Sequence, residues 1–593
     1  MSKELQCVLK TEVYPLFHSV EELIKQWPND PEDHPYDSLY KGRQILESLL
    51  KTVESACNGR QEEETWSTLL ACLTFQLGRN YADCSEPASA EVQFQAVVDY
   101  LKPFSLRPEC IVLLMQASNH TGVIWAERRE NEKALEFLLQ SKLYYDSYKA
   151  CSDAPPPWQE TRYLKKEQSH ESGEEGESIL AEECWKDFEM VHTYTLYFLA
   201  QVYGNMGESD TSALYCHATL CRQLESKEFD GIDWSLNSAA LSQYFITSGR
   251  FAQGRHCLCS AERVLADWEK GREEELSSVD SLREKVDQTR ADLARCWIKY
   301  SINALKESIE KMKNEQGGVD GKSEASGDGG SEPCGGAETD VEAEVVEKFQ
   351  GLDVSDLEEC VPAVLATTFE EARAYFLFAQ QCVESAKAFF TLNSHASDYA
   401  VIVQDYSSLF RLLAQFEQDP ERKCRMHKRR ADMLSDLTNQ LNPQHFLVIC
   451  RQCQYELGEI YYEMADLKIV LATEKDSPPP QAVAKINRLL RSSMAQFQHF
   501  VDSFSTGASS MDIPEEYLRS CVMAQMWIAR SHTRFVVTSP EVEATNVRAS
   551  LAAYQWVLNL AEKNPAAKQS CSKELDICKE MVQLLPGKLA KLQ

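Results

Sequence analysis

The chain of 593 residues repeats apolar side chains at the spacing of an α-helix over almost its whole length. Apolar positions fall at i, i+3, i+4 and i+7, so one stripe of each segment can be buried. One such stripe contains Ala134, Leu135, Leu138, Leu139 and Leu143. Strict alternation of apolar and polar residues, which is typical of a half-buried β-strand, is almost absent. The pattern therefore predicts an all-α fold.

Four polar segments interrupt this pattern, at residues 27–36, 152–177, 316–337 and 473–481. The third is rich in Gly, Ser and acidic residues, and such a composition buries too little apolar area to offset the entropy cost of ordering. The sequence therefore predicts an N-terminal solenoid over 1–279, a linker helix over 280–313 and a disordered acidic loop over 314–345. A C-terminal solenoid follows over 346–593, and its capping helix is expected over 572–585, before Pro586 and Gly587.

Internal repeats define the architecture more closely. The tetratricopeptide signature places an aromatic residue, Leu, Gly and Tyr on one helix, then Ala, an aromatic residue and a small residue on the next. Small residues let the two helices approach closely, and large ones fill the space between repeats. The clearest matches are Leu77-Gly78-x-x-Tyr81 with Ala90, Phe94, Val97 and Pro103, and Gly122 with Trp125, Ala134, Leu138 and Ser141; weaker copies begin at Leu199, Leu241, Leu293 and Leu457. The prediction is a right-handed α-solenoid of tetratricopeptide-like helix pairs, in two halves joined by a long linker helix.

Charge narrows the classes of partner. The formal net charge is −31, which repels nucleic-acid phosphates and anionic lipid surfaces. No apolar run is long enough to span a membrane, and the first residues lack the apolar core of a secretory signal. We therefore expect a soluble cytosolic protein that binds neither nucleic acid nor membranes, and a basic protein surface as its partner.

Enzyme chemistry is not indicated. Gly317-x-x-x-Gly321-Lys322-Ser323 is one residue short of a phosphate-binding loop and lies in low-complexity sequence. Cys450 and Cys453 have the spacing of half a zinc site, but no second pair accompanies them, so core packing is the favoured interpretation. We expect no catalysis, no cofactor, no metal and no small-molecule substrate.

A basic run at residues 423–430, Lys-Cys-Arg-Met-His-Lys-Arg-Arg, has two interpretations. It could act as a nuclear import signal, or it could be the solvated face of a helix. The preceding Asp419-Pro420-Glu421 is typical of a helix start, which favours the second interpretation.

The order of motifs resembles a known family, the KIF-binding (kinesin-binding) proteins. The resemblance covers nearly the whole chain and rests on six segments: Leu199-Ala-Gln-Val-Tyr203, Arg295-Cys-Trp-Ile-Lys-Tyr300, Phe369-Glu-Glu-Ala-Arg373, Met426-His-Lys-Arg-Arg430, Leu441-Asn-Pro-Gln444 and Glu580-Met-Val-Gln-Leu-Leu-Pro586. It implies a protein that grips the motor domains of certain kinesins and blocks their attachment to microtubules. It also implies a cytoplasmic, cytoskeleton-associated protein linked to axon growth and neuronal development. The alternative hypothesis is a general tetratricopeptide scaffold that recognises short peptides in a cytosolic or mitochondria-associated complex.

Repeat geometry then suggests which residues contact a partner, because the first helix of each pair lines the concave face of a solenoid. The candidates are the mostly uncharged polar and aromatic residues beside the small core residue of that helix, together with one helix-end glutamine that could reach the rim. They are Tyr197, Phe198, Gln201, Gln223, Asn237, Ala240, Gln243, Arg290, Arg295, Gln452, Tyr455 and Glu459. A strip of this kind inside an acidic shell is typical of the centre of an interface.

Overall fold

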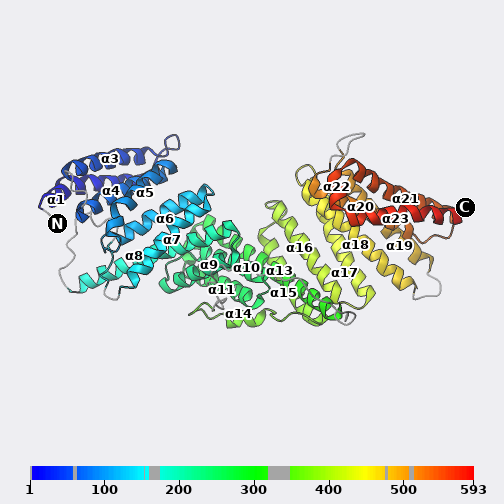
Figure 1. The fold of residues 1–593 in the computed structure, drawn as a ribbon. Helices are drawn as coiled ribbons and strands as arrows, with labels where there is room; N and C mark the ends of the chain where they lie inside the picture. Colours follow the sequence, from blue (N-terminus) through cyan, green and yellow to red (C-terminus); the bar gives the residue numbers. More distant parts are fainter. Residues whose placement is uncertain are drawn as a thin grey trace, which may run out of the picture. The chain divides into compact units, whose positions relative to one another are not determined.

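The computed structural model describes residues 3–57, 63–151, 154–158, 164, 174–317, 348–473, 479–505 and 513–592. Within these ranges the chain forms helices and no strand, which confirms the all-α prediction (Figure 1). Internal contacts divide the chain into two compact units. The N-terminal unit contains Met1–Asp230 with Ala343–Gln350, and the C-terminal unit contains Gly231–Glu342 with Gly351–Gln593.

The N-terminal unit is an array of helices in which chain neighbours pack on one another. A short π-helix, Leu9–Val13, separates its first two α-helices. Its α-helices are α1 (Lys3–Val8), α2 (Tyr14–Gln26), α3 (Asp37–Cys57), α4 (Glu64–Asp83), α5 (Pro87–Leu101), α6 (Ile111–Glu127), α7 (Asn131–Lys149), α8 (Glu174–Met206) and α9 (Ser209–Ser226).

The C-terminal unit continues the same pattern of stacked helix pairs. Its helices are α10 (Gly231–Thr247), α11 (Phe251–Lys270), α12 (Glu273–Ser278), α13 (Asp280–Gly317), α14 (Ser355–Cys360), α15 (Phe369–Phe389), α16 (Ala396–Phe416), α17 (Pro420–Gln440), α18 (Leu447–Thr473), α19 (Pro480–Asp502), α20 (Glu515–Arg534), α21 (Pro540–Lys563), α22 (Pro565–Ser570) and α23 (Ser572–Leu592). Capping side chains determine where two of these helices begin. Thr368 and Glu371 form a capping box before α15, and the side chain of Asp419 accepts from the backbone N–H of Glu421 before α17.

The small residues of the repeat signature lie where helices approach most closely. A Cβ added to Gly78 on α4 would lie 2.8 Å from Phe94 on α5, and one added to Gly122 on α6 would lie 2.7 Å from Leu138 on α7. Gly458 on α18 meets Phe497 on α19 in the same way, at 2.8 Å. The prediction of a solenoid of tetratricopeptide-like pairs is confirmed, and these glycines are the residues that permit the pairing.

The helix predicted over 280–313 is α13. It packs against α10, α11, α15 and α16, all within the C-terminal unit. Residues 314–317 continue this helix, so the predicted loop does not begin at 314; the remainder, 318–345, lies outside the described residues. The division into two solenoids on either side of residues 280–345 stays a prediction.

The predicted end of the last helix at Pro586 is wrong, because α23 runs through Pro586 and Gly587 to Leu592. A proline removes one backbone N–H donor and disfavours the helix locally, but it does not forbid continuation when packing holds the next turn. Leu589 and Leu592 pack against the buried cluster that includes Val557 and Leu585. This apolar contact accounts for the extra turns.

Four buried cysteines of the two units pack in the core as small apolar residues. Cys57 and Cys72 are buried in the main cluster of the N-terminal unit. Cys450 and Cys453 are buried among Leu457, Ile460 and Leu490 in the C-terminal unit, and burial raises the pKa of the Cys453 thiol to about 12. Both side chains therefore pack as the core interpretation of this pair expects.

Candidate partner-binding surface

In the N-terminal unit, the predicted contact residues fall on α8 and α9. Gln201 is exposed, whereas Phe198 packs against the core cluster that contains Leu138 and Leu199. Tyr197 is half-buried, with its ring edge against Phe198 at a centroid distance of 5.5 Å. Phe198 therefore supports the helix pair, while Gln201 is accessible to another protein.

Gln223, near the end of α9, has a polar atom that lacks a partner. Its side-chain oxygen Oε1 is buried, and no hydrogen bond reaches it within the part of the chain that the structure describes. A buried acceptor without a donor costs about 1–3 kcal/mol. Because this oxygen has almost no exposed surface, the predicted contact of Gln223 with a partner requires its side chain to turn outward.

In the C-terminal unit, α10 presents Asn237, Ala240 and Gln243. Asn237 is half-buried and Ala240 is exposed. Gln243 donates from Nε2 to the Ser242 hydroxyl at 3.1 Å, so part of its hydrogen-bonding capacity is already used. Asn237 makes no hydrogen bond to any described residue, which leaves its amide available to a partner.

The two predicted arginines on α13 are engaged in ion pairs. Arg290 lies 2.7 Å from Glu269 of α11, and Arg295 lies 3.1 Å from Asp398 of α16. The Arg295 guanidinium also lies over the Phe390 ring at 5.1 Å. Both side chains join α13 to its neighbours, and this structural role uses much of their capacity to bind a partner.

The remaining candidates lie on α18. Gln452 is exposed and accepts from Gln404 at 3.2 Å, and the Tyr455 ring packs edge-on against Phe497 and Phe500 at 5.4 and 5.3 Å. Glu459 is half-buried, and its pKa is raised to about 7, first by burial and then by the negative charge of Glu463. Tyr455 is mainly a packing residue, whereas Glu459 belongs to a larger acidic feature.

That feature is the acidic face of α18, formed by Glu456, Glu459 and Glu463. These residues are three and four positions apart, so they share one side of the helix. Arg430 of α17 is 1% exposed and faces them, with Nη2 3.0 Å from Glu456 and Nη1 3.4 Å from Glu463. Arg411 also lies close enough to lower the pKa of Glu459 and Glu463, so two arginines offset much of the charge of the three carboxylates.

The same arginine anchors a wider polar network. Its Nε donates to the Ser407 hydroxyl of α16 at 3.2 Å, and the Ser407 hydroxyl donates to Glu456 at 2.5 Å. His427 is also buried beside it, 3.0 Å from Arg430 Nη1, and burial followed by the positive charge of Arg430 lowers its pKa to about 3. The neutral imidazole therefore accepts a hydrogen bond from the guanidinium. Sequence reasoning missed this network, because its members come from three helices.

The basic run at 423–430 is divided between two sides of α17. Arg430 and His427 point into the buried network, while Arg425 and Lys428 are exposed. Arg429 is exposed as well and lies over the Phe410 ring at 5.9 Å. Because two of these side chains are buried in a helix, the run is not presented as a linear import signal. The helix-face interpretation fits its exposed members.

A second charged network stabilises the N-terminal unit at α8. Glu189 accepts from Tyr145 at 2.6 Å, from Lys149 at 2.8 Å and from Arg222 of α9 at 2.5 Å. Burial alone raises the pKa of a carboxyl, but these three hydrogen bonds outweigh it and lower the pKa of Glu189 to about 2. The network fixes α7, α8 and α9 relative to one another, and so positions the α8 face that presents Gln201.

The described part of the chain holds no group of three or more His, Cys, Asp or Glu side chains arranged to bind a metal ion. Among the described helices, none combines the length and the apolar composition that a membrane span requires.

These features define a class, that of helical-repeat proteins built from tetratricopeptide-like pairs with polar and acidic faces. The family model described as KIF-1 binding protein C terminal matches residues 232–592. The KIF-binding protein of Danio rerio is 34% identical over 95% of this chain and 94% of its own length, and that of Homo sapiens is 33% identical over 95% of each. The solved structure titled "Cryo-EM map of KIFBP" superposes with a TM-score of 0.61 at 28% identity, over 97% of this chain and 98% of the other.

The chain belongs to the KIF-binding protein family, as its match to the family model and its relatives show. The resemblance found in the sequence motifs is thereby confirmed over nearly the full length.

Proposed function

We propose that this protein binds kinesin motor domains and blocks their attachment to microtubules, without catalysing a reaction. The observation that supports this most strongly is that relatives named KIF-binding protein align with 95% of the chain. That alignment favours a motor-binding protein over a general scaffold for short peptides. A role in limiting motor-driven transport, and through it in cytoskeletal organisation and axon growth, is part of the same proposal.

Charge supplies a physical reason for the binding. A kinesin motor presents a basic surface to acidic tubulin, and this chain carries a net charge of −31. The acidic face of α18 offers carboxylates that compete for such a surface. Because ions screen charge beyond about 8 Å at physiological ionic strength, long-range attraction mainly accelerates encounter.

Affinity and specificity then come from short-range contacts. Among the predicted contact residues, the amide side chains of Gln201, Gln223 and Asn237 make no hydrogen bond to a described residue. Each neutral hydrogen bond to a partner contributes about 0.5–1.5 kcal/mol, so three of them contribute roughly 2–4 kcal/mol.

The test measures binding of a purified kinesin motor domain to the triple variant Gln201→Ala, Gln223→Ala, Asn237→Ala. We expect affinity to fall by about 30- to 900-fold, with a thermal melt that is not lowered, since the three side chains support no other described group. A matched control replaces three exposed glutamines of α21, α22 and α23, Gln555→Ala, Gln569→Ala and Gln583→Ala, and should bind normally. Equal affinity of both triple variants would reject these contact residues, and failure of the unaltered protein to bind any motor would reject the function.

A further inference from the structure

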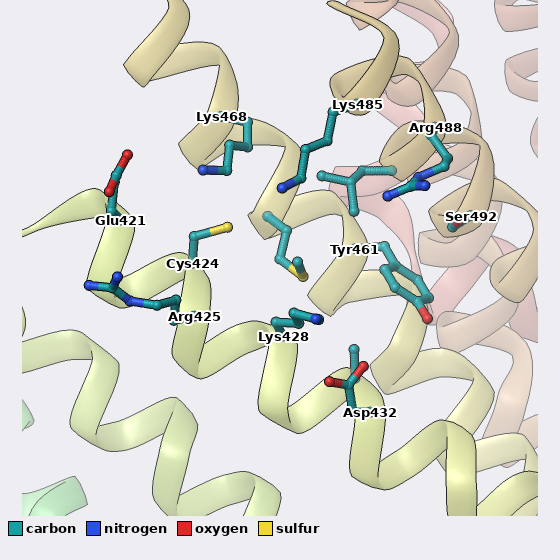
Figure 2. A pocket seen from close by; sticks show the side chains of 13 residues that line it. Glu421, Cys424, Arg425, Lys428, Asp432, Tyr461, Lys468, Lys485, Arg488 and Ser492 are labelled. Atoms are coloured by element: carbon teal, nitrogen blue, oxygen red, sulfur yellow. The ribbon is translucent and has the colours of Figure 1, made fainter. Parts of the chain in front are cut away.

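A cleft lined by cations lies between α17, α18 and α19 of this acidic protein. Its volume is about 420 Å³, and Figure 2 shows basic side chains converging on it from all three helices. Arg425 and Lys428 project from α17, Lys468 from α18, and Lys485 and Arg488 from α19. Glu421 and Asp432 are the acidic residues that line it, so the lining keeps a positive balance. Its remaining lining residues are Cys424, Ala431, Tyr461, Met464, Leu489 and Ser492.

These five cations are not used elsewhere in the described structure. None of their nitrogens lies within 4.0 Å of a carboxylate oxygen of a described residue, whereas Arg422 and Arg430 on the same α17 both form ion pairs. Five like charges around one small volume repel one another, so their proximity costs free energy. An anion in the cleft would remove that cost.

The cleft is separate from the acidic face of α18. With 3.6 residues per turn, Tyr461 and Lys468 lie about 120–180° around α18 from Glu456, Glu459 and Glu463, and Met464 lies between the two faces. The helix therefore carries its carboxylates toward Arg430 and a lysine toward the cleft. Because of this segregation the cleft is locally positive, although the chain as a whole carries a net charge of −31.

The chemistry of the lining suits phosphate groups. Arginine binds phosphate oxygens in a bidentate manner, and lysine supplies a compact point charge. The hydroxyls of Tyr461 and Ser492 add neutral donors at the cleft. The cleft also has an apolar part, formed by Cys424, Met464 and Leu489, which are 5–6% exposed.

We propose that this cleft binds a compact, soluble polyphosphate anion of the size of an inositol polyphosphate. A compact ligand is favoured because the cations converge on one open cleft instead of lying in a row. A soluble ligand is favoured because a protein of charge −31 is repelled by an anionic bilayer.

The experiment titrates the full chain with inositol hexakisphosphate by calorimetry at physiological ionic strength. We expect saturable binding at one site per chain. The double variant Lys468→Gln, Lys485→Gln should weaken it at least tenfold, and so should Arg425→Gln, Lys428→Gln from the opposite wall, which gives an independent test if either variant folds poorly.

A matched control, Lys563→Gln with Lys568→Gln, removes two exposed lysines outside the cleft that form no ion pair with a described residue, and it should bind within twofold of the original chain. Two further arms use vesicles that contain a phosphoinositide and a glutamate-rich peptide. Binding of the vesicles or of the peptide without binding of the soluble anion would overturn the proposal. So would equal binding by the cleft variants and the control, or no binding of the anion at all.

Discussion

Gly122→Ala is expected to destabilise the protein, although alanine is the better helix former. The glycine lies inside α6, where it lets α7 approach. An added Cβ would lie 2.7 Å from Leu138 Cγ, 3.0 Å from Leu138 Cδ2 and 3.2 Å from the backbone oxygen of Ala134. Contacts below 3.0 Å require a neighbour to move. Leu138 is 0% exposed, so it has little space to move into.

The magnitude follows from two opposing terms. Overpacking a well-filled core costs about 1–3 kcal/mol, and the site is at the upper end because a backbone carbonyl is among the atoms met. Replacing glycine by alanine inside a helix gains about 1 kcal/mol. The net expectation is a loss of about 2 kcal/mol in the free energy of unfolding.

Gly42→Ala is the matched control, since Gly42 also lies in a helix interior of the same unit. Its added Cβ would meet Val20 and Asn80 at 3.8 and 3.9 Å, which are ordinary contacts. This variant should therefore gain about 0.5–1 kcal/mol. The assay is urea unfolding of the full chain followed by circular dichroism, so that both variants report on the same transition. If Gly122→Ala proved as stable as the unchanged protein, the account of close helix approach would be refuted.

Two further predictions concern carboxylates with shifted pKa values. Glu189→Gln should lower the free energy of unfolding by about 2 kcal/mol at pH 7. The contacts of Glu189 stabilise only its ionised carboxylate, so this difference should vanish as the pH falls from the usual glutamate pKa toward 2. Urea unfolding at pH 7 and pH 3 measures it, and an equal loss at both pH values would contradict the role of the Arg222 and Lys149 hydrogen bonds. Glu459→Gln should raise stability by about 1 kcal/mol at pH 8 and leave it unchanged below about pH 4. The pKa of Glu459 is raised to about 7 beside Glu463, Glu456, Arg411 and Arg430, so its ionisation costs stability progressively as the pH rises from the usual glutamate pKa to about 7. A gain that did not depend on pH would show that charge is not the cause.

The sequence was sufficient to predict the helix-pair architecture, because that signal is local. Gly78 and Phe94 lie on consecutive helices joined by a single loop, and so do Gly122 and Leu138. Their spacing along the sequence therefore shows directly that they meet. Family membership was equally accessible, since motifs such as Leu199–Tyr203 are distributed along the whole length. The predicted helix end at Pro586 was wrong because proline disfavours a helix only locally. The packing of Leu589 and Leu592 against the core outweighs this tendency, and no local sequence pattern reveals that packing.

The character of the surfaces was harder to predict. Arg430 belongs to a conspicuous basic run, but its burial depends on Glu456 and Ser407, which come from other helices. The cleft combines Arg425 with Lys468 and Lys485, and only the first lies in that run. Arg290 and Arg295 were chosen from repeat position alone, and their ion pairs with Glu269 and Asp398 became visible only in three dimensions.

Co-sedimentation of a kinesin motor domain with microtubules, with and without this protein, tests the central claim most directly. The account predicts that the motor moves from the pellet to the supernatant as the protein is added, reaching completion near one protein per motor. A motor that stayed in the pellet at both low and physiological ionic strength, despite excess protein, would contradict it.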